Sequence, residues 1–530
     1  MNIKRAKEEI KNTIEAYLYR DAYGSYAIPA IRQRPVLLIG PPGVGKTQIM
    51  EQVAQECCIG LVSYTITHHT RQSAIGLPYI QERRYNGEAY SITEYTMSEI
   101  VASVYDKIES TGLREGILFI DEINCVSETL APAMLQFLQC KTFGNRSIPE
   151  GWVIVAAGNP PEYNKSVREF DIVTLDRIKL IYVEADFAVW KEYADRAGIH
   201  PAVVSYLEVK KQHFCQIETT VDGKIFATPR GWEDLSRLIE VYEKLGKTID
   251  REVVFQYIQH AKIAKDFANY LELYYKYQND YQVEEILGGT IRESVCDHLA
   301  RAPFDERLSV MSLLSARLNS QFQEVAEQED VLEHLQKELQ KVKPEHEDQE
   351  ERGEYEKNEE HEKNGEHPVS GLGLVTFDNA LDQLEAVTAG VVVEHRHRME
   401  AKLLNRRDDY RYRKVITALE SFVQTLKAEG VREHPEVWNR LKELFGEKSN
   451  QYEELFEQTG TMLEHGFDFM EAAFGDSQEM VVFLTGLNTG YYSIPFLQEY
   501  PCERYYQYNE RLLFDNREQE MAERIDRALR

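Results

Sequence analysis

The feature of this sequence that most constrains its fold is a glycine-rich loop between an apolar segment and a helix-forming one. The apolar segment 36–39 reads VLLI. The loop fits the pattern GxxxxGK[ST], in which backbone N–H groups and a helix N-terminus surround a polyphosphate. This pattern predicts an α/β fold in which the loop joins a strand to a helix. The loop consists of Gly40, Pro41, Pro42, Gly43, Val44, Gly45, Lys46 and Thr47.

We expect this loop to bind ATP together with Mg²⁺. Lys46 should contact the β and γ phosphates, and the Thr47 hydroxyl should ligate Mg²⁺. Gly43 and Gly45 permit the backbone geometry that turns N–H groups toward the ligand. The alternative is a chance glycine-rich turn. The lysine, the threonine and the flanking apolar segment together disfavour it.

A second candidate element is the acidic pair Asp121 and Glu122, which follows the apolar run 117–120. Charges at the carboxyl end of a strand lie where open α/β sheets bind their ligands. Asp121 is placed to hold Mg²⁺ through water, and Glu122 to polarise the water that attacks the γ phosphorus. Such a pair is weak evidence alone, because strands often end in acidic turns. After a phosphate-binding loop it predicts the catalytic carboxylates.

Three further residues are candidates for contact with a nucleotide. Asn159 follows the predicted strand 152–157, where its amide could contact the γ phosphate or the attacking water, although it could also be a simple turn residue. Arg230 begins a predicted helix and could touch the γ phosphate. Arg177 could reach the nucleotide of a neighbouring subunit. Each arginine could instead be a surface ion-pair residue, and Arg168 competes with Arg177 for the same role.

Apolar periodicity divides the chain into six predicted parts. Strands alternate with helices around the loop, which predicts a parallel sheet, and helical spacing follows almost throughout. One stretch has near-heptad spacing, which favours a long helix packed on its own chain over an intermolecular coiled coil. An acidic segment has too few apolar residues to offset the entropy of ordering, which predicts a disordered linker. The parts are an N-terminal helix (1–30), the α/β domain (31–188), a helical lid (189–303), the long helix (304–343), the linker (344–370) and a helical C-terminal domain (371–530).

Charge and cysteine content narrow the choice of partners. The net charge of -28 argues against broad nucleic-acid binding and favours protein partners. The seven cysteines include no CxxC pair, so neither a zinc site nor a disulfide framework is indicated. No apolar run approaches the roughly 18 residues that a membrane span requires, and the first residues lack the apolar core of a signal peptide. We therefore expect a cytoplasmic protein.

A basic cluster near residue 400 suggests a DNA-linked motor as an alternative function. Acidic residues are interleaved with the basic ones, so a salt-bridged helix face is the favoured interpretation. The cluster consists of Arg396, Arg398, Lys402, Arg406, Arg407, Arg411, Arg413 and Lys414, with Tyr410 and Tyr412 between them.

The order of these motifs resembles the AAA+ superfamily, and their detail resembles the MoxR branch of bacterial AAA+ ATPases. The resemblance covers about residues 32–247 and rests on GPPGVGKT, ILFIDEIN, VAAGNP, the arginines of LDR and TPR, and the loop 69–78. It implies a P-loop AAA+ parallel αβα sheet core with a helical lid, and ATP and Mg²⁺ as ligands. It also implies a homo-oligomeric, commonly hexameric ring that remodels a protein client in a chaperone-like manner, often with a von Willebrand A domain protein.

Two predicted hairpins support the same resemblance. Asn86–Gly87 joins two β-prone runs, and Asn-Gly is the strongest short hairpin signal. Gly144–Asn145 lies in a turn before the strand that begins at residue 152. In the resembled family these positions hold inserts that face the ring pore, while the alternative is two ordinary surface hairpins. The sequence beyond about residue 304 departs from the family.

The sequence thus favours a MoxR-like AAA+ ATPase, with a mostly α-helical C-terminal domain of unassigned role. A second hypothesis is an ATP-binding switch or scaffold with negligible turnover. Glu122 argues against that hypothesis, because a pure binding module does not need a carboxylate that polarises water.

Overall fold

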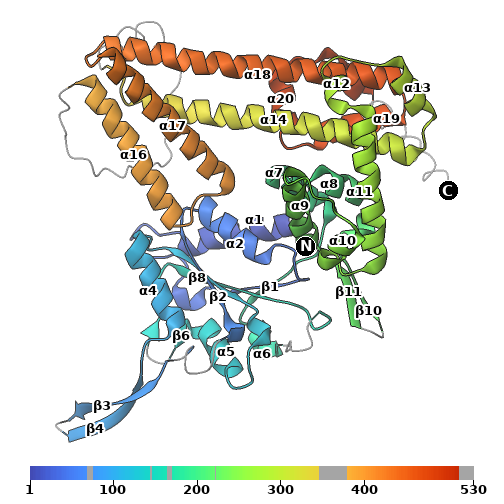
Figure 1. Ribbon diagram of the computed structural model, residues 1–530. Coiled ribbons are helices and arrows are strands. Elements are labelled where there is room, and N and C mark those ends of the chain that lie inside the picture. Colours follow the sequence, from blue (N-terminus) through green and yellow to red (C-terminus); the bar gives the residue numbers. More distant parts are fainter. Residues whose placement is uncertain are drawn as a thin grey trace, which may run out of the picture. The chain divides into compact units, whose positions relative to one another are not determined.

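The computed structural model describes residues 1–68, 74, 76–86, 88–143, 146–163, 170–220, 223–344 and 379–511. The chain forms two compact units (Figure 1). The first contains Met1–Tyr281 with Ala401–Leu403, and the second contains Gln282–Glu400 with Leu404–Arg530. These units are coarser than the six predicted parts, whose boundaries stay predictions. Almost all of the predicted linker lies outside the described residues.

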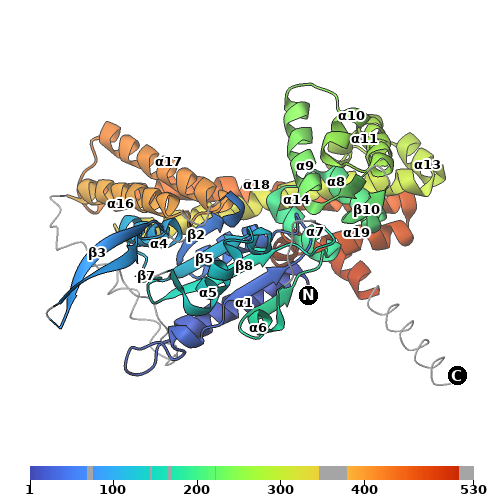
Figure 2. The ribbon, with the colours of Figure 1, turned by 90° about the horizontal axis from the view of Figure 1, so that it is seen from below.

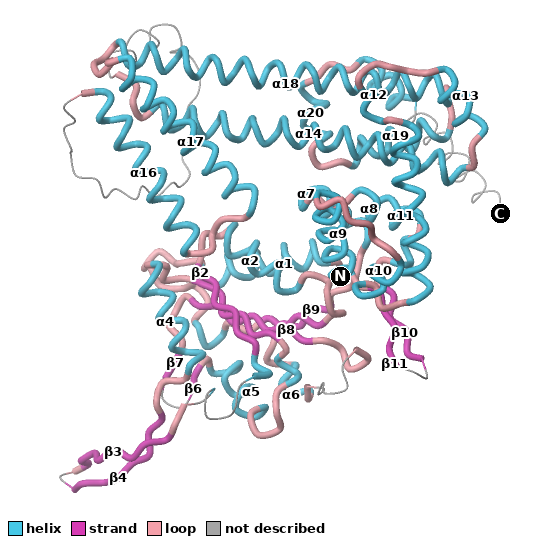
Figure 3. The backbone as a smooth tube through the Cα atoms, in the orientation of Figure 1, coloured by secondary structure: helices cyan, strands magenta, loops and turns pink. Residues whose placement is uncertain are grey.

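The centre of the first unit is a five-stranded sheet in which every neighbouring pair of strands is parallel (Figure 3). The predicted strands at 36–39, 117–120 and 152–157 are confirmed. Their residues are almost continuously hydrophobic, as expected of strands that are covered on both faces. In spatial order the strands are β2 (Gly60–Thr65), β5 (Gly116–Asp121), β8 (Trp152–Gly158), β1 (Val36–Ile39) and β9 (Lys179–Tyr182).

Helices cover both faces of this sheet, which confirms the αβα architecture (Figure 1). Successive residues of a strand point to opposite faces. In β5, Leu118 and Ile120 belong to one buried cluster, and Ile117 and Phe119 belong to the other. The first cluster includes residues of α4 (Glu99–Thr111) and α5 (Ala131–Cys140), and the second includes residues of α1 (Ile3–Leu18) and α2 (Lys46–Glu56).

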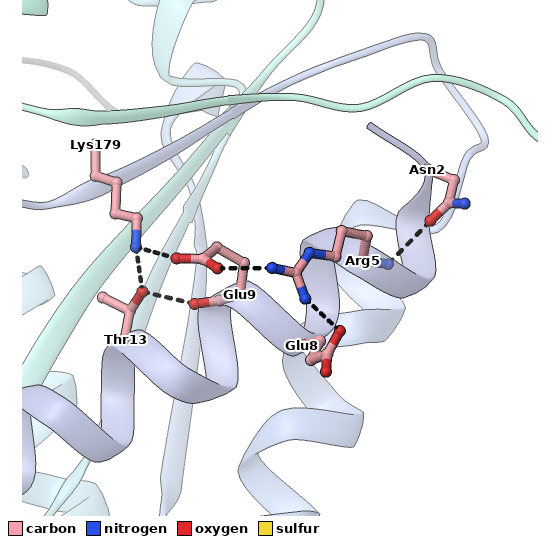
Figure 4. A network of polar contacts seen from close by, with 6 residues as sticks. All are labelled: Asn2, Arg5, Glu8, Glu9, Thr13 and Lys179. Carbon is pink, nitrogen blue, oxygen red and sulfur yellow. Dashed lines mark hydrogen bonds and ion pairs between the residues drawn. The ribbon is translucent and has the colours of Figure 1, made fainter.

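The N-terminal helix α1 is an integral part of the α/β unit. Ile10 is fully buried against the sheet. On the polar side, the Lys179 ammonium of β9 donates to Glu9 Oε1 at 2.6 Å and to Thr13 Oγ1 at 2.6 Å (Figure 4). The hydrogen bond and charge of Lys179 hold the pKa of Glu9 below its usual value. Apolar and polar contacts therefore both fix α1 to the sheet.

The region beyond residue 187 is less uniformly helical than predicted. A two-stranded antiparallel hairpin interrupts the helices, so the prediction of helix almost throughout is wrong there. The sequence carries the cause, since QIETT is rich in β-branched residues and an Asp-Gly pair stands where the returning strand begins. The elements are α7 (Phe187–Ala197), α8 (Pro201–Val209), β10 (Gln216–Thr220), β11 (Gly223–Ala227), α9 (Pro229–Lys244), α10 (Arg251–Tyr257) and α11 (Ala261–Tyr281).

The predicted hairpins are both present. The strands β3 (Pro78–Tyr85) and β4 (Glu88–Tyr95) pair antiparallel and extend away from the central sheet (Figure 2). The shorter pair is β6 (Thr142–Phe143) with β7 (Arg146–Ser147). The turn residues Gly87, Gly144 and Asn145 lie outside the described residues, as do 69–73 and 75 of the loop 69–78.

The second unit is helical in its described part, as predicted for the C-terminal domain. In the longest predicted amphipathic stretch, Leu335 and Leu339 are buried in a core shared with three later helices. This confirms that the stretch packs on its own chain. The helices are α12 (Val283–Leu287), α13 (Glu293–Arg301), α14 (Phe304–Gln340), α16 (Ala380–Glu400), α17 (Arg406–Glu429), α18 (Glu436–Phe474), α19 (Gln478–Thr489) and α20 (Ser493–Glu499).

The basic cluster near residue 400 is interleaved with ion pairs, as the salt-bridged interpretation predicts. Arg407 Nη2 lies 2.5 Å from Asp330 Oδ2, and Arg411 Nη2 lies 3.0 Å from Asp408 Oδ1. Tyr412 is buried. Within the described ranges, the search for a helix long and apolar enough to cross a bilayer finds none.

The buried face of α1 gives a test of its place in the core. We expect Ile10→Ala to lower the free energy of unfolding by about 2–4 kcal/mol, because it removes a fully buried aliphatic side chain and leaves a cavity. Glu15→Ala, at an exposed position of the same helix, should change stability by no more than about 0.5 kcal/mol. Urea unfolding followed by circular dichroism measures both. Equal effects of the two substitutions would contradict the assignment.

Candidate nucleotide-binding site

The loop between β1 and α2 has the backbone geometry that its glycines allow. Gly43 has φ of 79° and Gly45 has φ of 90°, in the left-handed region that strains other residues. Gly45 directly precedes α2, whose first residue is Lys46. The N–H groups at the start of this helix lack partners within the helix, and the helix dipole favours negative charge there. The loop can therefore receive a polyphosphate.

Lys46 makes three hydrogen bonds through its ammonium group. Its ammonium donates to Gly40 O at 2.8 Å, to Pro41 O at 2.8 Å and to Asn159 Oδ1 at 3.0 Å. Burial lowers the pKa of Lys46 to about 8, and the Asp121 carboxylate partly opposes this effect. The contact with Asn159 joins the end of β8 to the loop that follows β1.

The acidic pair lies at the carboxyl end of β5, beside the start of α2. The Thr47 hydroxyl donates to Asp121 Oδ2 at 3.2 Å, and Asp121 Oδ1 accepts from the Glu122 backbone N–H at 2.9 Å. Glu122 has φ of 55°, an uncommon backbone conformation for a residue with a side chain. A hydroxyl and a carboxylate side by side are the hard oxygen donors that Mg²⁺ prefers. The residues present thus fit this metal.

The backbone of Asn159 accepts a hydrogen bond from Asn124, a residue that the sequence analysis did not identify. Asn124 Nδ2 donates to the backbone oxygen of Asn159 at 2.8 Å. A methyl group at position 158 would overlap the Asn124 side chain, so only glycine fits there. Asn124 therefore fixes the backbone from which the Asn159 amide reaches Lys46.

The helix α9 closes one side of the site. The Cβ atom of Arg230 would lie only 3.1 Å from a Cβ atom at Gly43, so the start of α9 packs directly on the loop. A cavity of about 270 Å³ lies between them. It is lined by Pro42, Gly43, Gly45, Lys46, Thr47, Gln48, Asp121, Glu122, Asn159, Arg230, Glu233, Asp234 and Arg237.

Several predicted residues do not line this cavity. Gly40 and Pro41 contribute carbonyl oxygens to Lys46, and the Val44 side chain is buried in the core. Arg177 is exposed, and its guanidinium donates to Gln139 Oε1 at 2.6 Å. Arg168 lies outside the described residues.

The cavity also contains residues of α9 that the sequence reasoning overlooked. Glu233 is buried, pairs with Arg237 and accepts a hydrogen bond from the Tyr193 hydroxyl at 3.1 Å. Burial and the nearby Glu233 carboxylate raise the pKa of Tyr193 to about 12. Glu233, Asp234 and Arg237 follow Arg230 by three, four and seven residues, a spacing that places side chains on one face of a helix. That spacing could have identified them.

Residues 35–178 match the family model of the AAA domain of the dynein-related subfamily. This region is an AAA domain. It contains the phosphate-binding loop, the acidic pair, Asn159 and Arg177, whereas Arg230 and the whole second unit lie outside the match. A comparison with curated proteins found no match for the chain.

The lowered pKa of Lys46 predicts a pH dependence of nucleotide binding to the AAA domain. Above about pH 8 the ammonium loses its proton and with it its attraction for phosphate. We expect the affinity for ATP to fall by up to about tenfold per pH unit above that value. Titrations with a fluorescent ATP analogue from about pH 6.5 to about pH 9.5 measure this.

Lys46→Arg is the matched control, because a guanidinium stays charged over the whole range. Its affinity, whatever its absolute value, should not fall with pH. A flat profile for the unsubstituted protein would contradict the assignment of Lys46 to phosphate binding.

Proposed function

We propose that the chain is a MoxR-like AAA+ ATPase, which couples Mg²⁺-dependent ATP binding and hydrolysis to the remodelling or activation of a protein client. The observation that carries the proposal is the convergence of three strand ends on one cavity. Lys46 contacts Asn159 at 3.0 Å, and Thr47 contacts Asp121 at 3.2 Å. Residues more than 70 positions apart thereby meet around a loop suited to polyphosphate.

The side chains divide the work of hydrolysis. Lys46 neutralises charge on the β and γ phosphates, and Thr47 and Asp121 hold Mg²⁺, which supplies further positive charge at the phosphates. Glu122 orients a water and accepts its proton as the new bond to the terminal phosphorus forms and the bond to the ADP oxygen breaks. Asn159, placed by Asn124, holds the water or the terminal phosphate in line.

Two arginines complete the site in this proposal. Arg230 lies in the first turn of α9 against the loop, from where it contacts the γ phosphate and makes the position of the lid depend on this contact. Arg177 acts on the nucleotide of a neighbouring subunit in a homo-oligomeric ring, hexameric as in the resembled family. Its exposure and its place outside the cavity of its own chain support this role.

The client is a protein, for which a von Willebrand A domain protein is the candidate that the resemblance offers, and the setting is the cytoplasm. The hairpin β3–β4 supports the client role, because its residues are nearly all exposed. An isolated hairpin with two uncovered faces is only marginally stable in water, and contact with another chain would stabilise it.

Glu122→Gln separates binding from hydrolysis. We expect the variant to bind ATP with an affinity close to that of the unsubstituted protein, while steady-state phosphate release falls at least about a hundredfold. Glu109→Gln, an exposed carboxylate on α4, is the matched control and should leave turnover unchanged. Full hydrolysis by the Glu122→Gln variant would remove Glu122 from the mechanism. An unsubstituted protein that binds ATP but releases no phosphate would instead be an ATP-binding switch.

Mixing two inactive variants tests whether Arg177 acts between subunits. Arg177→Ala leaves the nucleotide site intact, whereas Glu122→Gln leaves Arg177 intact. In an equal mixture, about a quarter of neighbouring pairs combine an intact site with an intact arginine, so about a quarter of the turnover should return.

The control mixes Arg177→Ala with the double variant Glu122→Gln, Arg177→Ala, which should restore nothing. Co-assembly is checked by size-exclusion chromatography. Mixed assemblies without turnover would refute the exchange between subunits. If the Arg177→Ala variant alone retained full turnover, Arg168 would become the candidate for the arginine that acts on a neighbouring subunit's nucleotide.

A further inference from the structure

A second cavity, also of about 270 Å³, lies within the helical unit and is lined by residues of α14, α17 and α18. None of its lining residues belongs to the nucleotide site. Val331 and Leu335 form a buried apolar floor, and the exposed residues Lys414 and Lys448 stand at its rim. We propose that this cavity binds a medium-chain carboxylate, with the hydrocarbon on the floor and the carboxylate between the two lysines.

The shape of the cavity suits a single aliphatic chain. Its lining positions on α14 run from Gln328 to Leu335, and those on α18 run from Lys448 to Leu455. Each set spans about two helical turns, or roughly 10 Å. A cavity of about 150 Å³ holds a six-carbon ring, so this one has room for roughly ten non-hydrogen atoms. A helix with its side chains is about 10 Å wide and would need a much larger groove.

The charges at the rim select an anion. Among the described residues, no carboxylate oxygen lies within 4.0 Å of either ammonium. Lys414 stands over the Tyr410 ring at 5.3 Å, and Lys448 Nζ is 3.5 Å from Gln451 Oε1. The chain has 89 acidic and 61 basic residues, and several basic neighbours on α17 are paired with carboxylates. Two ammonium groups without a carboxylate within 4.0 Å therefore stand beside the apolar floor of this cavity.

The cavity is also polarised along its length. Tyr452 lies one helical turn beyond Lys448 on α18 and lines the cavity. Burial, with the charges of Glu329 and Glu499, raises the pKa of Tyr452 to about 12. The negative charges of Glu329 and Glu499 thus act on the Tyr452 side chain. A carboxylate head is therefore favoured beside the two lysines, away from these acidic groups.

Calorimetric titration of the full chain with sodium decanoate, kept below its micellar concentration, tests the proposal. We expect saturable binding, and about tenfold weaker binding for each of Lys414→Gln and Lys448→Gln, since each removes a charge-assisted contact. Lys414→Arg should retain most of the affinity. Acetate should not bind, because it lacks the chain. Decanol should bind weakly and equally to the unsubstituted protein and both glutamine variants.

Two further variants make the test specific. Ala418→Leu fills the cavity and should abolish binding of both decanoate and decanol, with folding checked by circular dichroism. Lys427→Gln, which removes a charge outside the cavity on the same helix, should have no effect. Absence of saturable decanoate binding would overturn the proposal. The proposal would also be overturned if the Ala418→Leu variant still bound decanoate, or if neither lysine substitution lowered the affinity for decanoate. ATP binding is independent of these outcomes.

Discussion

The described structure of the α/β unit depends on one buried positive charge, the Lys46 ammonium. An unpaired ammonium away from water costs several kcal/mol, so its position is viable only if polar oxygens surround it. Those oxygens come from Gly40, Pro41 and Asn159, at the ends of two neighbouring strands. Only a parallel register that brings the carboxyl ends of β1 and β8 to the same edge can supply them together. The burial of the Lys46 ammonium therefore requires the parallel arrangement of β1 and β8.

The helices around the sheet stabilise the edge at which the carboxyl ends of its strands lie. α1 covers one face of the sheet, where Ile10 is buried, and Lys179 of β9 donates to Glu9 of this helix. This contact stabilises β9, an edge strand of the sheet and the strand farthest from the acidic pair at the end of β5. On the open side, α9 begins against Gly43 and carries Arg230, Glu233 and Arg237 along the cavity. The two arginines and two carboxylates of α9, with Asp234 as the second carboxylate, line the same space. A shift of α9 would therefore change the charge that faces a bound phosphate.

The parts of the molecule that local pattern determines could be predicted from the sequence. Three of the five sheet strands, the loop at Gly40–Thr47, the exposed hairpin and the packing of the long helix were predicted, because short-range periodicity and turn residues specify them. No residue range was predicted for β2 or β9. The hairpin β10–β11 was missed, because strong helical patterns precede and follow its two five-residue strands. The sequence analysis also overlooked α9 beyond Arg230 as a lining of the site.

Contacts between distant residues could not be predicted in this way. Asn124 acts through the backbone of Asn159, and no motif spacing reports a hydrogen bond between a side chain and a carbonyl 35 residues away. Arg177 was assigned to a neighbouring subunit from its motif alone, and its contact with Gln139 has no sequence signal. The cavity of the second unit depends on how three helices diverge, which side-chain volumes decide and periodicity does not. Domain boundaries and residue roles stay predictions.

The glycine at position 158 has a consequence for how the strand ends move. Because the Asn124 side chain fills the space beside it and donates to the Asn159 backbone, the segment after β5 is packed directly against the end of β8. A displacement of the acidic pair would therefore press on the backbone that carries the Asn159 amide. The two halves of the reaction centre are joined by contact as well as by the sheet.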